Sequence, residues 1–71
     1  MKIVAAIQVT LSLNDDKTRK REIRGLLEAM NTYNLKEGLI ITENEAEIID
    51  MEDKKIVIKP VFEWLDELKR D

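Results

Sequence analysis

Apolar residues recur at every second position in the first part of the chain, a period of two that is typical of a β-strand. We expect this strand over residues 1–13. One face carries Ile3, Ala5, Ile7, Val9, Leu11 and Leu13. The other carries Val4, Ala6, Gln8, Thr10 and Ser12. The first face is expected to be covered, and the second, which is smaller and mildly polar, to admit a close neighbour.

The next segment has helical periodicity, and we expect a helix over residues 15–31. Asn14, Asp15 and Asp16 end the strand and supply N-terminal caps, because their side-chain oxygens satisfy free backbone N–H groups. The apolar face is formed by Ile23, Leu26, Leu27, Met30 and Tyr33. Gly25 weakens the helix by about 1 kcal/mol relative to Ala but admits close packing. The helix-breaking residues after it are Asn31, Asn34 and Gly38.

Three further strands and a helix complete the expected order. The strands are 38–42, 46–51 and 55–59, and the last two are joined by a turn at Glu52 and Asp53. Pro60 suits the first turn of the final helix. The buried side expected for that helix consists of Val61, Phe62, Trp64, Leu65 and Leu68. We therefore predict one α/β domain, residues 1–71, with a small mixed sheet, the order βαβββα and a right-handed parallel crossover.

Two aromatic residues of the final helix, Phe62 and Trp64, are only two positions apart. They cannot both point fully inward from a short helix. Core packing is the general expectation for such residues, but one of the two is expected at the rim, where it could join an interface.

The composition excludes several chemistries. The 71 residues include no Cys and no His, which removes disulfides, thiolate metal sites and Ser–His or Cys–His nucleophile pairs. The net charge is −3, and 44% hydrophobic residues indicate a globular chain. No apolar run is long enough for a membrane span or a signal peptide, so we expect a cytoplasmic protein. Abundant Lys, Glu, Arg and Ile, with a single Gln, suggest a heat-adapted source.

Basic residues form a stripe on the first helix, away from its apolar face. The stripe consists of Lys17, Lys20, Arg21 and Arg24, with Arg19 to one side. Cations near a helix N-terminus oppose the macrodipole. One interpretation is therefore a binding surface for phosphate groups or for an acidic protein. The alternative is a solvated helix face, partly neutralised by Glu22 and Glu28. No aromatic residue interleaves with the stripe, so base stacking lacks support.

Acidic residues dominate the segment that contains the predicted hairpin. They are Glu43, Glu45, Glu47, Asp50, Glu52 and Asp53. Magnesium or a basic partner is one interpretation, but metal binding needs carboxylates that converge, and strand residues alternate sides. A solvated edge that resists aggregation is the alternative we favour. This acidic segment and the basic stripe could also meet, within one molecule or between two.

Gln8 and Thr10 are the remaining polar candidates, on the less apolar face of the first strand. Their spacing alone favours a hydrogen-bonded polar pair near a sheet edge or beneath a loop.

Several segments resemble a known family, in order and over nearly the whole chain. They are residues 13–30, the strand around Ile7-Gln8-Val9, residues 39–43 and residues 56–65. Together they are similar to the C-terminal domain of a prokaryotic family of AAA-type ATPases, common in archaea. That domain resembles the restriction-endonuclease-like fold of the PD-(D/E)XK superfamily. The resemblance implies that this chain forms part of that core.

The resemblance also implies that the first strand corresponds to the active-site strand of that fold. Gln8 matches its acid-or-Gln position, whereas Thr10 stands where active nucleases have Lys. The Asp of an earlier strand has no counterpart, and no Gly-rich loop ending in Lys-Ser or Lys-Thr is present. Metal-dependent phosphodiester cleavage needs these groups. We therefore expect no catalytic residues, no metal and no cofactor, in a stand-alone remnant, an excised domain or a truncated relative.

These observations lead to one functional expectation and one alternative. We expect a non-catalytic interaction module whose contact surface is the basic stripe. The alternative is a metal-dependent nuclease completed by oligomerisation or by a partner. The face from Val4 to Ser12 and one sheet edge are expected to be bare, which favours a homo-oligomer, most simply a twofold dimer. A protein partner or nucleic acid are further candidates, and a membrane is not.

Overall fold

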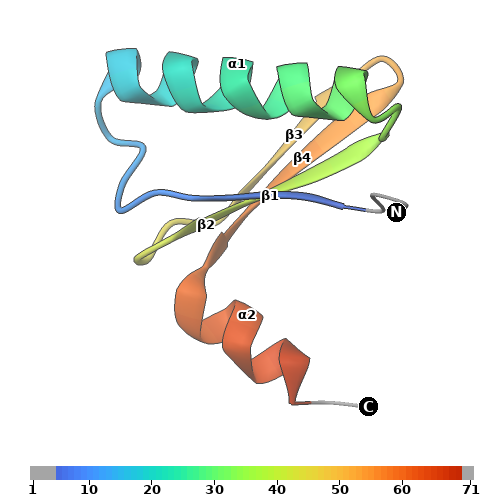
Figure 1. Ribbon diagram of the computed structural model, residues 1–71. Coiled ribbons are helices and arrows are strands. Elements are labelled where there is room, and N and C mark those ends of the chain that lie inside the picture. Colours follow the sequence, from blue (N-terminus) through green and yellow to red (C-terminus); the bar gives the residue numbers. More distant parts are fainter. Residues whose placement is uncertain (1–4, 70–71) are drawn as a thin grey trace.

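The computed structural model describes residues 5–69 of the chain, and its elements follow the predicted α/β order βαβββα. They are β1 (Ala6–Val9), α1 (Asp16–Thr32), β2 (Glu37–Thr42), β3 (Glu47–Met51), β4 (Lys54–Pro60) and α2 (Val61–Leu68). Figure 1 shows α1 on one side of the sheet and α2 on the other, where it follows directly from the end of β4.

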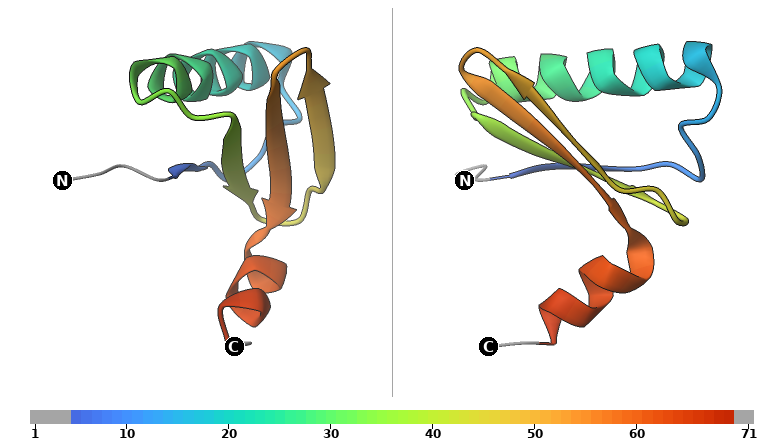
Figure 2. Two further views of the ribbon diagram at one scale, coloured as in Figure 1. Left: turned by 90° about the vertical axis from the view of Figure 1, so that its right-hand side faces the viewer. Right: turned by 180° about the vertical axis from the view of Figure 1, so that it is seen from behind.

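The four strands form one mixed sheet in the order β1-β2-β4-β3. β1 and β4 both pair with β2 in parallel, and β3 pairs with β4 as an antiparallel hairpin. In this register Gly38 lies between Ala6 and Ile56. The views in Figure 2 show the strands side by side with α1 above them. The sheet therefore has two edges, β1 and β3, of very different composition.

Both ends of α1 are closed by local hydrogen bonds. At the start, the Asp15 carboxylate accepts a bond from the Thr18 backbone N–H at 2.9 Å. At the end, Asn34 adopts a left-handed conformation with φ of 55°. The Leu35 N–H then donates to the Met30 carbonyl at 2.7 Å, which satisfies a carbonyl that the helix leaves unpaired.

The core lies between α1 and the sheet. Its buried members are Ala6, Leu13, Leu26, Met30, Ile40, Ile56 and Ile58. Gly38 lets α1 approach, because a Cβ at this position would lie 2.7 Å from the Met30 sulfur. Close packing over a glycine fixes the distance between helix and sheet.

The first strand is shorter than predicted. β1 spans Ala6–Val9, and residues 1–4 of the predicted strand lie outside the described residues. Beyond Val9 the chain still contacts β2, because the Thr10 N–H donates to the Ile41 carbonyl at 2.9 Å. It then turns away to reach the start of α1.

The expectation of a bare Val4–Ser12 face is wrong for the residues that the structure describes. Ala6 is buried beneath α1, and the Gln8 side chain lies 3.7 Å from the position of a Cβ on Gly25. Small side chains on this face admit the helix, as their size predicted. The opposite face was expected to be covered, yet Val9 is 73% exposed and Leu11 is 74% exposed.

The predicted buried side of α2 is also wrong. Among its residues none is buried, and Phe62 is 67% exposed. The physical reason is its position: α2 begins directly after Pro60, contacts the sheet only through β2 and β4, and extends past the end of the strands (Figure 1). Trp64 is partly buried and Phe62 lies at the rim, as expected for two aromatics so close in sequence.

Candidate functional site

Gln8 points from β1 toward α1 and is engaged there. Its Nε2 donates to the Glu22 carboxylate at 2.6 Å and to the Glu22 backbone carbonyl at 3.2 Å. Gln8 is thus hydrogen-bonded as a structural residue, but its partner is Glu22, and the hydrogen bonds described for its side chain do not include the predicted pair with Thr10. The amide therefore fastens β1 to the helix above it.

Thr10 lies one residue beyond the C-terminal end of β1. It lines a shallow hollow of about 350 Å³. The other lining residues are Val9, Leu11, Ile41, Thr42, Glu43 and Val61. This lining is mostly apolar, with a single carboxylate and no Lys. Gln8 is not among the residues that line this hollow.

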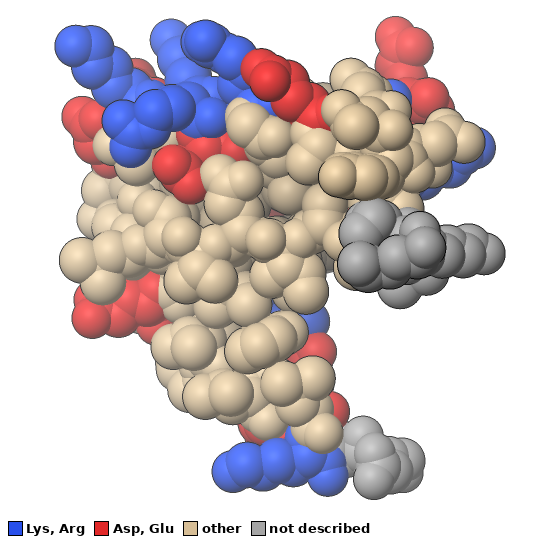
Figure 3. All heavy atoms as spheres, in the orientation of Figure 1, with Lys and Arg blue, Asp and Glu red and all other residues tan. Residues whose placement is uncertain are grey.

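The basic stripe is solvent-facing over most of its length. Lys17, Lys20, Arg21 and Arg24 are exposed on α1. Figure 3 shows Lys and Arg side chains gathered over this helix at the upper left. Arg21 lies 3.6 Å from the Glu22 carboxylate, which leaves its guanidinium largely in water. The stripe is a positive surface with no enclosed site.

Arg19, beside the stripe, has a different role. Its guanidinium donates to the Glu47 carboxylate at 2.7 Å, and so it links α1 to β3. This hydrogen bond raises the pKa of Arg19 above its ordinary value. The acidic segment and the basic residues therefore meet within one molecule at this pair, and Arg19 is occupied in holding the fold.

Glu45 has a structural role that its sequence context did not reveal. Its carboxylate accepts a bond from the Leu13 N–H at 2.7 Å. Its own N–H donates to the buried Thr42 hydroxyl at 2.9 Å. Leu13 and Glu45 are far apart in sequence, so only the folded chain brings this carboxylate beneath the loop before α1.

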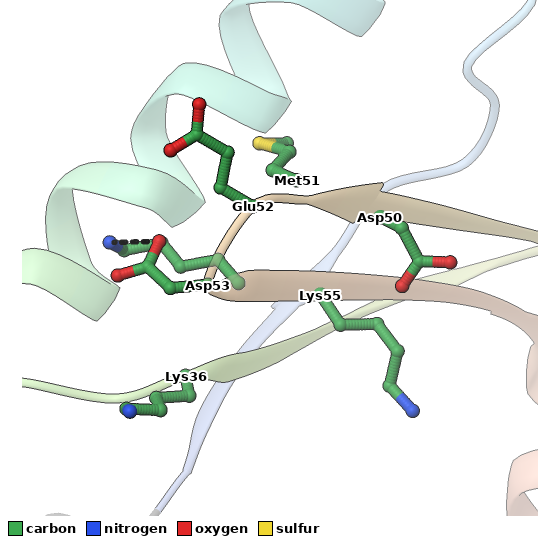
Figure 4. Close-up of a pocket in the computed structure, with 7 residues that line it drawn as sticks. Lys36, Asp50, Met51, Glu52, Asp53 and Lys55 are labelled. Carbon is green, nitrogen blue, oxygen red and sulfur yellow. Dashed lines mark ion pairs between the residues drawn. The ribbon is translucent and has the colours of Figure 1, made fainter.

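The hairpin tip carries the remaining acidic side chains. Figure 4 shows Asp50, Glu52 and Asp53 around a hollow of about 470 Å³, pointing in different directions. Asp53 forms an ion pair with Lys54 at 3.6 Å. Among residues 5–69, no group of three acidic side chains could hold a metal ion. The arrangement agrees with a solvated edge.

Large apolar side chains are exposed on the side of the sheet away from α1. We call the following set the apolar surface: Ile7, Val9, Leu11, Val61, Phe62, Leu65 and Leu68. Figure 3 shows an uncharged band that runs from below the basic side chains of α1 down to α2. Ile48 is also exposed, but it lies on β3 at the other edge. The signal that could have identified this surface is the lack of any charge between Lys2 and Asp15.

No helix within residues 5–69 has the length and apolar character needed to cross a membrane. No protein-family model, curated protein or solved structure matches this chain.

Proposed function

We propose that this chain is a non-catalytic, cytoplasmic interaction module that associates with itself through the apolar surface. The observation that supports this proposal is the exposure of that surface, up to 74% at Leu11. The proposed relationship to the C-terminal domain of AAA-type ATPases, with part of a restriction-endonuclease-like core, rests on the resemblance of the sequence segments.

The size of the apolar surface supports a stable contact. At roughly 200 Å² for a fully exposed large apolar residue, its seven members present on the order of 800 Å². The largest apolar patch of an ordinary monomer is about 300–600 Å². A standard interface buries about 800 Å² per partner, so one partner could cover this surface completely.

A second copy of the chain is the partner we propose. The apolar surface combines a flat part on β1 with a helical part on α2, so a twofold axis can bring unlike parts of the two copies together. Charged neighbours on this side are already paired within the chain, with Lys59 2.6 Å from Glu67 and Lys55 3.8 Å from Glu37. Association would leave neither lysine without a partner.

Light scattering at tens of micromolar tests this self-association. We expect twice the mass of the chain for the natural protein, and the mass of one chain for Leu65→Lys. Tyr33→Lys is the matched control, because Tyr33 is 52% exposed but lies at the end of α1. A monomeric natural protein would contradict the proposal, as would dissociation by the control alone.

The environment of Gln8 supports the non-catalytic part of the proposal. Its amide is held by Glu22, and Thr10 supplies no positive charge for a phosphate. The alternative function, a metal-dependent nuclease, needs carboxylates and a lysine from another molecule. We expect supercoiled plasmid to stay intact with Mg²⁺ or Mn²⁺. Cleavage that Gln8→Ala abolishes would support the nuclease, and cleavage that survives this change would indicate contamination.

The basic stripe is a second contact surface, for an acidic protein or for nucleic acid. Exposure of all four of its side chains supports this role. Electrophoretic mobility at low salt distinguishes the two ligands. A shift of DNA or RNA that is lost in Arg21→Glu and retained in Lys36→Glu would favour nucleic acid. The absence of a shift at any salt concentration would leave the protein ligand.

A further inference from the structure

The outer edge of β1 has unpaired backbone groups. Among the described strands, β1 pairs only with β2. The Thr10 N–H points to β2, and alternate residues of a strand direct their N–H and C=O groups to opposite sides. The backbone groups of Ile7 and Val9 therefore point away from β2, toward the free edge. Such a row is a template for another strand.

The two edges of the sheet differ in charge. β3 carries Glu47 and Asp50 within the acidic segment, and like charges at an edge repel a second copy. β1 carries no charge at all. Figure 3 views the molecule from the β1 side and shows the uncharged band there. Pairing of two β1 edges also gives a closed dimer, whereas pairing of β1 with β3 of the next copy would give an open-ended chain of copies.

Apolar side chains of β1 are far more exposed than their neighbours in the central strand. On the same face of the sheet, Ile41 of the central strand β2 is 1% exposed, whereas Val9 beside it is 73% exposed. Val9 is thus exposed mainly because no described strand lies beside β1 at this edge. The face of the sheet away from α1 is covered at β2, where Ile41 lies.

We propose that β1 pairs antiparallel with β1 of a second copy, so that two sheets become one continuous eight-stranded sheet. This inference rests on the self-association proposed above and specifies its geometry. The pairing is centred on Gln8, which places Ile7 of each copy opposite Val9 of the other. Both residues then exchange backbone hydrogen bonds across the axis, and their side chains form one apolar row.

The position of Gly25 fits this centre. Gly25 is exposed on α1, and a Cβ at this position would lie 3.7 Å from the Gln8 side chain. A twofold axis between the two Gln8 residues runs beside Gly25 of both copies, where the two α1 helices approach each other. The lack of a side chain at Gly25 provides the space for that approach.

The same geometry brings α2 into the contact. Val61 lines the shallow hollow together with Val9 and Leu11. Because Ile7 of the second copy lies beside Val9, it also lies next to Val61. The pairing therefore covers the β1 part of the apolar surface together with Val61, at the start of α2.

Disulfide cross-linking tests the register, since the natural chain has no Cys. Single variants Ile7→Cys and Val9→Cys, one of them labelled with ¹⁵N, are mixed, allowed to exchange and oxidised. Positions 7 and 9 of opposite copies have Cα atoms about 5.5 Å apart, within disulfide range, whereas like positions are about 7 Å or more apart. By intact mass, we expect the mixed 7–9 disulfide at well above its random share of about half.

Light scattering of Val9→Lys separates the possible failures, with Tyr33→Lys as the control and circular dichroism as the check on folding. A monomeric natural protein overturns both the self-association and the β1 pairing. A dimer that gives no excess of the mixed disulfide overturns the pairing alone and leaves self-association through the faces of the sheet. An excess of the mixed disulfide, together with dissociation by Val9→Lys, supports the pairing.

Discussion

The two glycines of the chain have different surroundings, and their substitution by alanine should have opposite effects. A Cβ at Gly38 would lie 2.7 Å from the Met30 sulfur and 2.9 Å from Leu26, so Gly38→Ala should lower the free energy of unfolding by about 1–3 kcal/mol. Among the described residues outside α1, a Cβ at Gly25 would meet nothing closer than the Gln8 side chain, at 3.7 Å. Gly25→Ala should raise the free energy of unfolding by up to about 1 kcal/mol, because alanine favours the helix.

Urea denaturation followed by Trp64 fluorescence measures both glycine variants. The chain should be diluted below the range of self-association, so that only the monomer contributes. No loss of stability in Gly38→Ala would mean that the packing of Gly38 against α1 differs from that described, and a loss in Gly25→Ala would mean the same for the surroundings of Gly25.

Asp15 should make the stability of α1 depend on pH. Hydrogen bonds from the Thr18 N–H, and then from the Thr18 hydroxyl, lower the pKa of Asp15 below its ordinary value of 3.8. A carboxylate with a lowered pKa in the folded state stabilises that state fully above the unfolded pKa. The contribution is lost as the pH falls through the folded pKa. We therefore expect the thermal midpoint of the natural protein to decrease as the pH is lowered below about 4.

The variant Asp15→Asn isolates this contribution, because Asn also caps helices but does not titrate. Its thermal midpoint should change less between about pH 5 and pH 3 than that of the natural protein. Identical pH profiles would show that the Asp15 cap does not contribute to the acid sensitivity.

At the scale of elements, the bond between Arg19 and Glu47 joins α1 to β3. The two side chains are 30% and 46% exposed, so water screens the pair. A double-mutant cycle with Arg19→Ala and Glu47→Ala should give a coupling free energy of about 0.2–1 kcal/mol, decreasing with added salt. A coupling near zero at low salt would mean that this pair does not help to hold α1 over the sheet.

Sequence periodicity predicted the elements well because each has a local physical cause. The cap at Asp15 and the turn at Asn34 set the limits of α1 within one residue of those expected. The contact of Gln8 with Glu22 could not be predicted, since it depends on how the helix is placed over β1. The apolar side of α2 could be recognised from the sequence, but a pattern cannot show whether another element covers it.

At the scale of the whole molecule, the charges divide into separate regions. Four basic residues lie on the outside of α1, and acidic residues lie along β3 at one edge of the sheet. The opposite edge, β1, has no charged residue. The alternation in the first strand identified its two faces correctly. The face with Ile7 and Val9 was expected to be covered, but α1 covers the face with Ala6 and Gln8. The small Ala6 side chain lets α1 approach this face, and Gln8 faces α1 through its hydrogen bonds to Glu22.

Self-association through β1 should make the thermal stability depend on protein concentration. A domain of this size buries only about 60% of the surface that its unfolded chain exposes, so association adds a large share of its stability. When only the folded chain associates, mass action raises the thermal midpoint as concentration rises, here by roughly 5–10 °C for a hundredfold increase. Calorimetry of the natural protein and of Val9→Lys measures this effect. The midpoint of the variant should not change, because a lysine at the seam removes the association that concentration favours.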